Sequence, residues 1–150
     1  MDKLISTFFE IEVSDGVAHL VMNRPEKANG MSPDFWEDLP RLTQELEQDM
    51  TIRAMVISGK GKHFTGGMDL NAFGSIMDLL NNEPGRSSYE MRRLVLKLQN
   101  SFNALEEARF PVIAAIHGAC IGGGIDMISA CDIRLASSDA TFSIEEINIG

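Results

Sequence analysis

Two apolar segments of this chain each lead into a glycine-rich loop, and this pattern limits the possible folds. Residues 52–58 precede the glycine pair at 66–67, and residues 112–116 precede the glycine triplet at 122–124. A short apolar segment that ends near glycine is typical of a buried strand followed by a turn. If the two strands are neighbours in one sheet, both loops emerge at the same edge, where α/β proteins bind their ligands.

The rest of the chain alternates predicted strands with predicted helices. Residues 8–13 and 17–23 flank a turn, which predicts a β-hairpin. Ser32 and Pro33 match the N-cap and first turn of a helix, and the apolar spacing extends that helix to about residue 48. Similar patterns predict helices over 89–108 and 124–130, a strand over 131–136, and a loop with at most a short helix over 71–88. The alternation indicates a layered α/β fold.

Composition excludes several classes of protein. The chain has 150 residues, of which 44% are hydrophobic and 23% charged, and its net charge is −9. This composition fits a folded domain, and the negative charge disfavours nucleic-acid partners. The sequence has neither an apolar run of membrane-spanning length nor a signal-peptide pattern, so we expect no membrane partner and a cytoplasmic location. Cys120 and Cys131 lie in apolar stretches without companion ligands, which predicts buried structural cysteines and no metal site.

The last residues of the sequence are unlike an ordinary domain terminus. Residues 142–149 form an apolar-rich stretch that continues to Gly150. Domain termini are usually frayed and poorly ordered, so this pattern is atypical. We therefore expect residues 1–150 to be the N-terminal core of a larger domain that is incomplete at its C-terminus.

The glycine triplet and two nearby carboxylates predict a site that stabilises negative charge. Glycine lets a ligand approach the backbone closely, and unpaired N–H groups at a helix start favour anions. Asp126 and Glu146 follow the triplet and are candidate bases. The alternatives are a plain strand-to-helix turn for the loop and a helix-start acid for Asp126. The chain lacks both common phosphate-binding glycine patterns. The favoured hypothesis is an oxyanion site.

Five motifs together resemble the crotonase superfamily, also called the enoyl-CoA hydratase/isomerase superfamily. Their order and spacing match the family across nearly the whole chain, at residues 23–29, 64–70, 117–126, 130–134 and 142–150. The resemblance implies an α/β superhelix of repeated ββα units that binds acyl-CoA thioesters. It implies no separate cofactor, because CoA is part of the substrate. It also implies a homotrimer or hexamer when the full-length chain is present.

The resemblance implies roles for individual residues. The family's oxyanion hole maps onto the backbone N–H groups of Met68 and Gly123, and its catalytic carboxylates map onto Asp126 and Glu146. Neighbouring residues of a strand point to opposite faces, so the spacing from Asp126 favours Glu146 over Glu145 as the residue that faces the site. The residues implied in CoA binding are Arg24, Lys27, Ala28, Asn29, Thr65, Gly66, Gly67, Asp69 and Leu70.

An aspartate at position 126 resembles the dienoyl-CoA isomerase branch of the family, because the hydratases carry glutamate there. That branch implies isomerisation of a 3,5-dienoyl-CoA to a 2,4-dienoyl-CoA in fatty-acid β-oxidation. Glu146 would remove the C2 proton, Asp126 would position or tune it, and a further aspartate beyond Gly150 would return a proton. The alternatives are an enoyl-CoA hydratase and a non-catalytic CoA-binding fragment.

Overall fold

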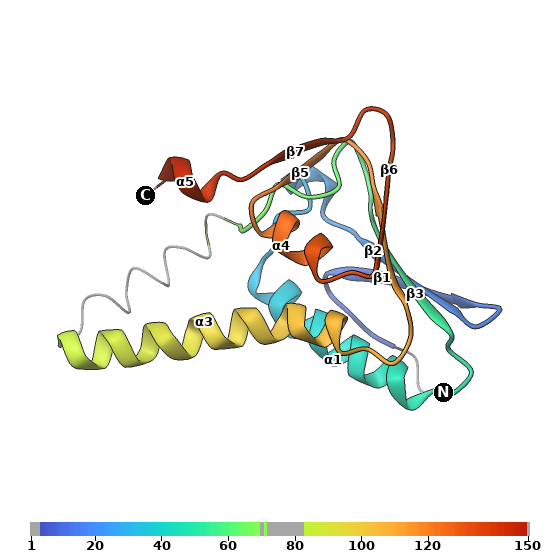
Figure 1. Ribbon diagram of the computed structural model, residues 1–150, viewed down its shortest axis with the longest axis horizontal. Coiled ribbons are helices and arrows are strands. Elements are labelled where there is room, and N and C mark those ends of the chain that lie inside the picture. The colour runs from blue at the N-terminus through green and yellow to red at the C-terminus, as the bar shows by residue number, and fades with distance from the viewer. Residues whose placement is uncertain (1–3, 70, 72–82, 150) are drawn as a thin grey trace.

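The computed structural model describes residues 4–69, 71 and 83–149, and it has the predicted layered α/β architecture (Figure 1). Leu70 and residues 72–82 lie outside the described residues, as does most of the loop expected over 71–88. In chain order the elements are β1 (Phe9–Ser14), β2 (Val17–Met22), the short 3-10 helix η1 (Pro25–Lys27), α1 (Pro33–Gln48), β3 (Ala54–Gly59), α3 (Pro84–Glu106), β4 (Val112–Ile116), β5 (Ala119–Ile121), α4 (Gly123–Ser129), β6 (Ile133–Ala136), β7 (Thr141–Ser143) and α5 (Glu146–Ile149).

A five-stranded sheet in the order β1-β2-β3-β4-β6 forms the centre of the fold, and β5 and β7 form a separate two-stranded sheet. The predicted hairpin is confirmed, because β1 and β2 pair antiparallel around a turn with positive φ angles at Asp15 and Gly16. The pairs β2–β3, β3–β4 and β4–β6 are all parallel. Since β3 and β4 are parallel neighbours, the segments that follow them leave the same edge of the sheet, as expected, but the glycine triplet comes only after the short strand β5, which was not predicted.

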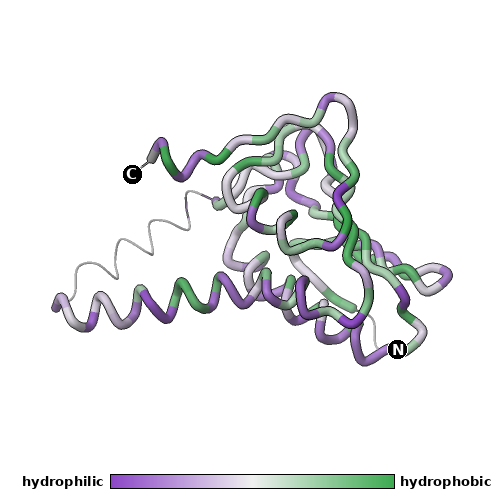
Figure 2. The backbone as a smooth tube through the Cα atoms, viewed as in Figure 1, coloured by the Kyte–Doolittle hydropathy of each residue, from purple (hydrophilic) through white to green (hydrophobic). Residues whose placement is uncertain are grey.

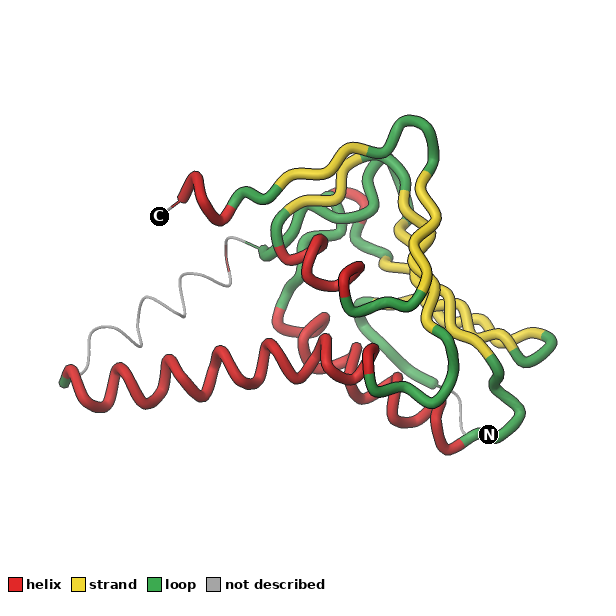
Figure 3. The backbone as a smooth tube through the Cα atoms, in the orientation of Figure 1, coloured by secondary structure: helices red, strands yellow, loops and turns green. Residues whose placement is uncertain are grey.

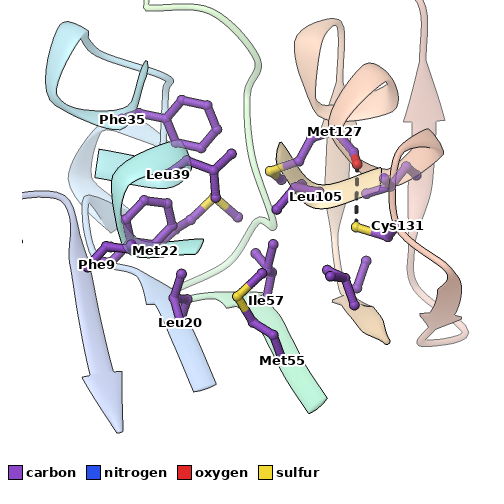
Figure 4. Packing of buried hydrophobic residues seen from close by; sticks show 14 of the residues in the cluster. Phe9, Leu20, Met22, Phe35, Leu39, Met55, Ile57, Leu105, Met127 and Cys131 are labelled. Carbon is purple, nitrogen blue, oxygen red and sulfur yellow. Dashed lines mark hydrogen bonds between the residues drawn. The ribbon is translucent and has the colours of Figure 1, made fainter. Parts of the chain in front are cut away.

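The helices α1 and α4 and the C-terminal end of α3 lie on one face of the large sheet, and the rest of α3 projects away from it (Figures 1 and 3). The opposite face is less enclosed, because alternate residues of β4 such as Ile113 and Ala115 are only half-buried. The apolar face of α1 is buried in the core, which stabilises the packing of these layers. Figure 4 shows the side chains that meet in this core, among them Phe35, Leu39, Leu20, Met22, Met55, Ile57, Leu105 and Met127.

Two helix starts differ in detail from the sequence prediction. Ser32 occupies the N-cap position of α1, but its hydroxyl makes no cap hydrogen bond and has no partner among the described residues. Helix α3 begins at Pro84, earlier than predicted, because Glu83 acts as its cap. The Glu83 carboxylate accepts hydrogen bonds from the Gly85 and Arg86 N–H groups, at 3.0 and 3.1 Å. Hydrophilic and hydrophobic residues alternate along α3, as expected for an amphipathic helix (Figure 2).

The two cysteines are buried and unpaired, as predicted. Burial raises the pKa of Cys120 to about 11 and that of Cys131 to about 12, so both thiols stay protonated at neutral pH. The Cys131 thiol donates a weak hydrogen bond to the Met127 carbonyl in α4, at 3.4 Å (Figure 4). Within the described part of the chain, no helix is both long and apolar enough to cross a membrane.

Candidate active site

A cavity of about 1010 Å³ lies where the two glycine loops meet. The loop after β3 contributes Gly67 and Met68 to one wall, and the start of α4 contributes Gly123 beside them. Trp36, Leu98 and Phe102 supply apolar surface, and the carboxylates Asp126, Glu145 and Glu146 are among the acidic groups that line the cavity. The cavity therefore combines bare backbone, apolar surface and acidic side chains.

The first glycine loop holds Met68 by hydrogen bonds on both sides of it. Met31 N–H donates to the Gly67 carbonyl at 2.8 Å, and Asp69 N–H donates to the Met31 carbonyl at 3.1 Å. Gly67 has φ +85°, and a Cβ placed there would lie 2.7 Å from the Ile121 carbonyl oxygen. A glycine is needed at this position for both reasons. Within the described residues, nothing accepts a hydrogen bond from Met68 N–H.

The second glycine loop leaves a further amide without a partner. Gly122 has φ +54°, and its N–H donates to the Ser143 carbonyl at 2.9 Å. Helix α4 begins at Gly123, and the first N–H groups of a helix have no acceptor within it. Gly123 N–H also lacks an acceptor elsewhere in the described ranges. The cavity thus contains two unpaired amides, which favour a negatively charged or strongly polarised oxygen.

The structure brings Asp126 and Glu146 together beside the same loop. Asp126 lies in the first turn of α4, and Glu146 begins α5. The Asp126 side chain lines the cavity and is partly buried. This burial raises the pKa of Asp126, and the nearby Glu146 charge raises it further. A Cβ on Gly122 would lie 2.8 Å from Glu146 Oε1, so that carboxylate packs directly over the glycine. The two carboxylates are close enough to influence each other electrostatically.

The prediction that Glu145 and Glu146 lie in a strand is wrong. Strand β7 ends at Ser143 and Glu146 starts a helix, so both glutamates reach the cavity. Glu145 is held in place, because its carboxylate accepts hydrogen bonds from the Ser143 hydroxyl and from Asn148 Nδ2. These two hydrogen bonds lower the pKa of Glu145. The preference for Glu146 stays a prediction, now supported by its contact with Gly122 instead of by strand alternation.

The residues predicted to bind CoA gather where the loop after β2 meets the loop after β3. Gly66 N–H donates to the Ala28 carbonyl at 2.7 Å, and the Arg24 guanidinium pairs with Asp69 at 3.1 Å. Lys27 is exposed on η1. Leu70 lies outside the described residues.

Two of these predicted residues have side chains that solvent cannot reach. Asn29 and Thr65 are both 0% exposed. The Asn29 amide donates to the carbonyls of Lys60 and His63, each at 2.9 Å. Their side chains cannot contact CoA while they are buried, so the CoA-binding role of Asn29 and Thr65 stays a prediction that involves only their backbone. They shape the loops from within the protein.

Sequence reasoning missed the apolar wall of the cavity. Trp36 is only 6% exposed and belongs to the aromatic core, where its ring lies 5.2 Å from that of Phe102. Leu98 and Phe102 belong to the apolar stripe of α3. A helix that faces a cavity has the same periodicity as one that faces a core, so nothing in the local pattern separates the two.

The Arg24–Asp69 pair leads to a prediction about stability and pH. Asn71 N–H, which donates to Asp69 Oδ1 at 3.0 Å, and the Arg24 guanidinium hold the pKa of Asp69 below its ordinary value. A depressed pKa in the folded state stabilises the protein above the unfolded pKa, and this contribution is lost as pH falls below about 4. We expect Asp69→Asn to lower the free energy of unfolding by about 1 kcal/mol at pH 7 and by less at pH 3.

Urea denaturation of the wild type and of Asp69→Asn between pH 3 and pH 7 measures this difference. Glu12→Gln is the control, because Glu12 is an exposed carboxylate on β1. A difference in the free energy of unfolding between the wild type and Asp69→Asn that stays constant from pH 3 to pH 7 would contradict the prediction.

The layered α/β fold presents two unpaired amides beside two carboxylates, and such groups can stabilise negative charge on an oxygen and accept a proton. The chain belongs to the enoyl-CoA hydratase/isomerase family, whose sequence model matches residues 12–150. The predicted family and its crotonase-like α/β fold are thereby confirmed.

Individual relatives agree with this assignment. The chain is 47% identical over 135 residues to the peroxisomal Δ(3,5)-Δ(2,4)-dienoyl-CoA isomerase of Arabidopsis thaliana, covering 89% of this chain and 49% of the relative. It is 45% identical to the mitochondrial dienoyl-CoA isomerase of Mus musculus, covering 89% of this chain and 41% of the relative. The crystal structure of an enoyl-CoA hydratase from Mycobacterium smegmatis superimposes with a TM-score of 0.77 at 29% identity, covering 91% of this chain and 49% of that one. The chain spans about half the length of the curated relatives it matches.

Proposed function

We propose that the protein carrying this chain isomerises a 3,5-dienoyl-CoA to a 2,4-dienoyl-CoA. The observation that carries the proposal is the pair of unpaired amides, at Met68 and Gly123, beside Asp126 and Glu146 in one cavity. Relatives that are named dienoyl-CoA isomerases and cover 89% of the chain support the same reaction. The pathway is fatty-acid β-oxidation.

In the proposed mechanism the thioester carbonyl oxygen accepts hydrogen bonds from Met68 N–H and Gly123 N–H. Glu146 removes a proton from C2, and the electron pair moves into the carbonyl to give a conjugated enolate. When the enolate collapses, the double bonds shift and a proton is added at C6. One proton leaves and one arrives, so substrate and product are isomers. Loss of one such amide donor typically reduces the rate by a hundredfold to a thousandfold.

Asp126 acts on Glu146 in this proposal. Burial, and then the neighbouring Glu146 charge, raise the pKa of Asp126, so the two carboxyl groups interact electrostatically. Through this interaction Asp126 tunes or positions Glu146. Because Asp126 stands on the helix that supplies Gly123, its position is tied to that of the oxyanion donor.

The CoA portion lies along the loops after β2 and β3 in this proposal. The exposed Lys27 ammonium contacts a phosphate, and the backbone of residues 65–69 lines the pantetheine path. CoA enters only as part of the substrate, without a separate cofactor. We further propose that the intact protein is a homotrimer or hexamer. We also propose a cytoplasmic location, whereas the relatives are named peroxisomal or mitochondrial.

The test uses the intact protein and a 3,5-dienoyl-CoA substrate. Formation of a conjugated 2,4-dienoyl thioester, followed by its ultraviolet absorbance and confirmed by mass spectrometry at unchanged mass, is the expected result. A simple 2-enoyl-CoA is assayed in parallel, because two carboxylates beside one amide pair can also activate a water. Hydration of the enoyl-CoA without any isomerisation of the dienoyl-CoA would replace the isomerase proposal with the hydratase. Binding of CoA without turnover of either substrate would favour a non-catalytic CoA-binding protein.

A further inference from the structure

Thr65 is fully buried at the point where the two glycine loops touch. Its hydroxyl donates to the Asn29 carbonyl at 2.9 Å and accepts a hydrogen bond from Gly67 N–H at 3.1 Å. Gly67 directly precedes Met68. The Thr65 hydroxyl therefore fixes the peptide next to the first unpaired amide.

The main chain of Thr65 binds the other loop. Thr65 N–H donates to the Ala119 carbonyl at 3.0 Å, and Ile121 N–H donates to the Thr65 carbonyl at 3.1 Å. These two hydrogen bonds form an isolated parallel bridge between Thr65 and Cys120. The segment that they hold leads directly into Gly122 and Gly123.

The methyl group of Thr65 fills a space that a glycine leaves open. A Cβ placed on Gly124 would lie 2.5 Å from Thr65 Cγ2, a distance that real Cβ contacts essentially never show. Gly124 is itself buried in the first turn of α4 and follows Gly123. Hence the methyl group sets how closely the start of α4 approaches the first loop.

We propose that Thr65 is a positioning residue that sets the separation of the Met68 and Gly123 amides. This inference rests on the oxyanion role proposed above for those two amides. Both donors must point at one oxygen from about 3 Å, and an error of about 1 Å can cost a hundredfold in rate. Thr65 contacts both glycine loops. Its hydroxyl forms a hydrogen bond within the first loop, while its main chain pairs with the segment before the second loop and its methyl group packs against Gly124. Its buried side chain acts without touching the substrate.

The first test compares single substitutions in the intact protein. Thr65→Val keeps the shape of the side chain and removes the hydroxyl, and we expect kcat for the dienoyl-CoA to fall by about tenfold or more with KM changed less than about threefold. Thr65→Ser keeps the hydroxyl, so we expect it to retain more kcat than Thr65→Val.

Thr43→Val is the matched control for the loss of a buried hydroxyl. Thr43 is also 0% exposed, and its hydroxyl donates to the Leu39 carbonyl within α1 at 2.8 Å. We expect Thr43→Val to lower thermal stability and leave kcat unchanged. An unaltered kcat in Thr65→Val, or an equal loss in Thr43→Val, would overturn the proposal.

A double substitution tests the contact with α4. Gly124→Ala places a methyl group against Thr65 Cγ2 and is expected to reduce kcat strongly. Thr65→Ser removes that Cγ2 atom, so the combined variant Thr65→Ser/Gly124→Ala is expected to recover part of the lost kcat. If the losses of kcat in the two single variants simply added up in the double variant, the two residues would not control the site together.

Crystal structures of the wild type, Thr65→Val and Thr43→Val provide a readout that does not depend on turnover. We expect the Met68 and Gly123 nitrogens to change their separation by about 0.5 Å or more in Thr65→Val only. If the wild type fails to isomerise any dienoyl-CoA, the proposed function falls while this comparison still tests Thr65. An unchanged separation in Thr65→Val would refute the positioning role, whatever the reaction.

Discussion

Replacing Gly122 with alanine is expected to lower kcat by about a hundredfold to a thousandfold, the cost of losing an oxyanion donor. Gly122 adopts φ +54° and ψ −123°, a conformation that is essentially restricted to glycine. An alanine Cβ would in addition lie 2.8 Å from Glu146 Oε1. The substitution therefore forces the backbone that leads into Gly123 to change and pushes the candidate base away.

The expected loss is in turnover more than in folding. Gly122 N–H donates to the Ser143 carbonyl, so a shift of this peptide also disturbs the end of β7, from which Glu146 follows. Circular dichroism and thermal melting separate the two effects. We expect a cooperative melt for Gly122→Ala together with a low kcat.

Gly85→Ala is the control for a glycine-to-alanine change in the same chain. Gly85 lies in the first turn of α3, where a Cβ would meet only the flexible Glu83 carboxylate, at 3.3 Å. We expect kcat of this variant to match the wild type. A Gly122→Ala protein that kept more than about a tenth of the wild-type kcat would show that the strained turn is not needed to place the Gly123 donor.

The sheet and the position of the site could be predicted because they depend on local patterns. Apolar strands ended by glycine identify β3 and β4, and the rule that parallel neighbours share a carboxyl edge then brings Met68 and Gly123 together. The start of α1 at Pro33 also follows from residues adjacent in sequence. The strands and the start of α1 need no knowledge of distant contacts, whereas the pairing of β3 with β4 joins distant segments and is only a condition at the level of the sequence.

The roles of Asn29 and Thr65 could not be predicted, because they depend on contacts between distant segments. The Asn29 amide donates hydrogen bonds to carbonyls more than thirty residues away, and its backbone is left-handed, with φ +52°. Glu146 presents the same difficulty, since β7 is too short to fix which way the next residues turn. Polar residues in loops are usually exposed, so a local pattern assigns them to the surface.

Replacing Glu146 with glutamine is expected to reduce kcat by about a hundredfold to ten-thousandfold, the usual value of a general base. The amide keeps the shape of the side chain but cannot accept a proton from C2. Glu146 packs over Gly122 and lines the same cavity as Met68 and Gly123, which is the location that the proposed base requires. KM should change much less than kcat, since the base contributes mainly in the transition state.

The substitution also changes the titration of Asp126. Burial and the Glu146 charge both raise the pKa of Asp126, and glutamine removes only the second cause. We therefore expect the pKa of Asp126 in Glu146→Gln to lie below its wild-type value, measured by carboxyl ¹³C NMR. A carboxyl group with a raised pKa destabilises the folded state when it is ionised, so this cost at neutral pH decreases in the variant.

Glu145→Gln is the comparison that assigns the base, because Glu145 lines the same cavity one residue earlier. Its carboxylate is already engaged by the Ser143 hydroxyl and Asn148 Nδ2, which makes it a poor proton acceptor. We expect Glu145→Gln to lose less than about tenfold in kcat, far below the loss in Glu146→Gln. If Glu145→Gln were the inactive variant and Glu146→Gln the active one, the base would be Glu145. The hydrogen bonds around Glu145 would then have to break before each proton transfer.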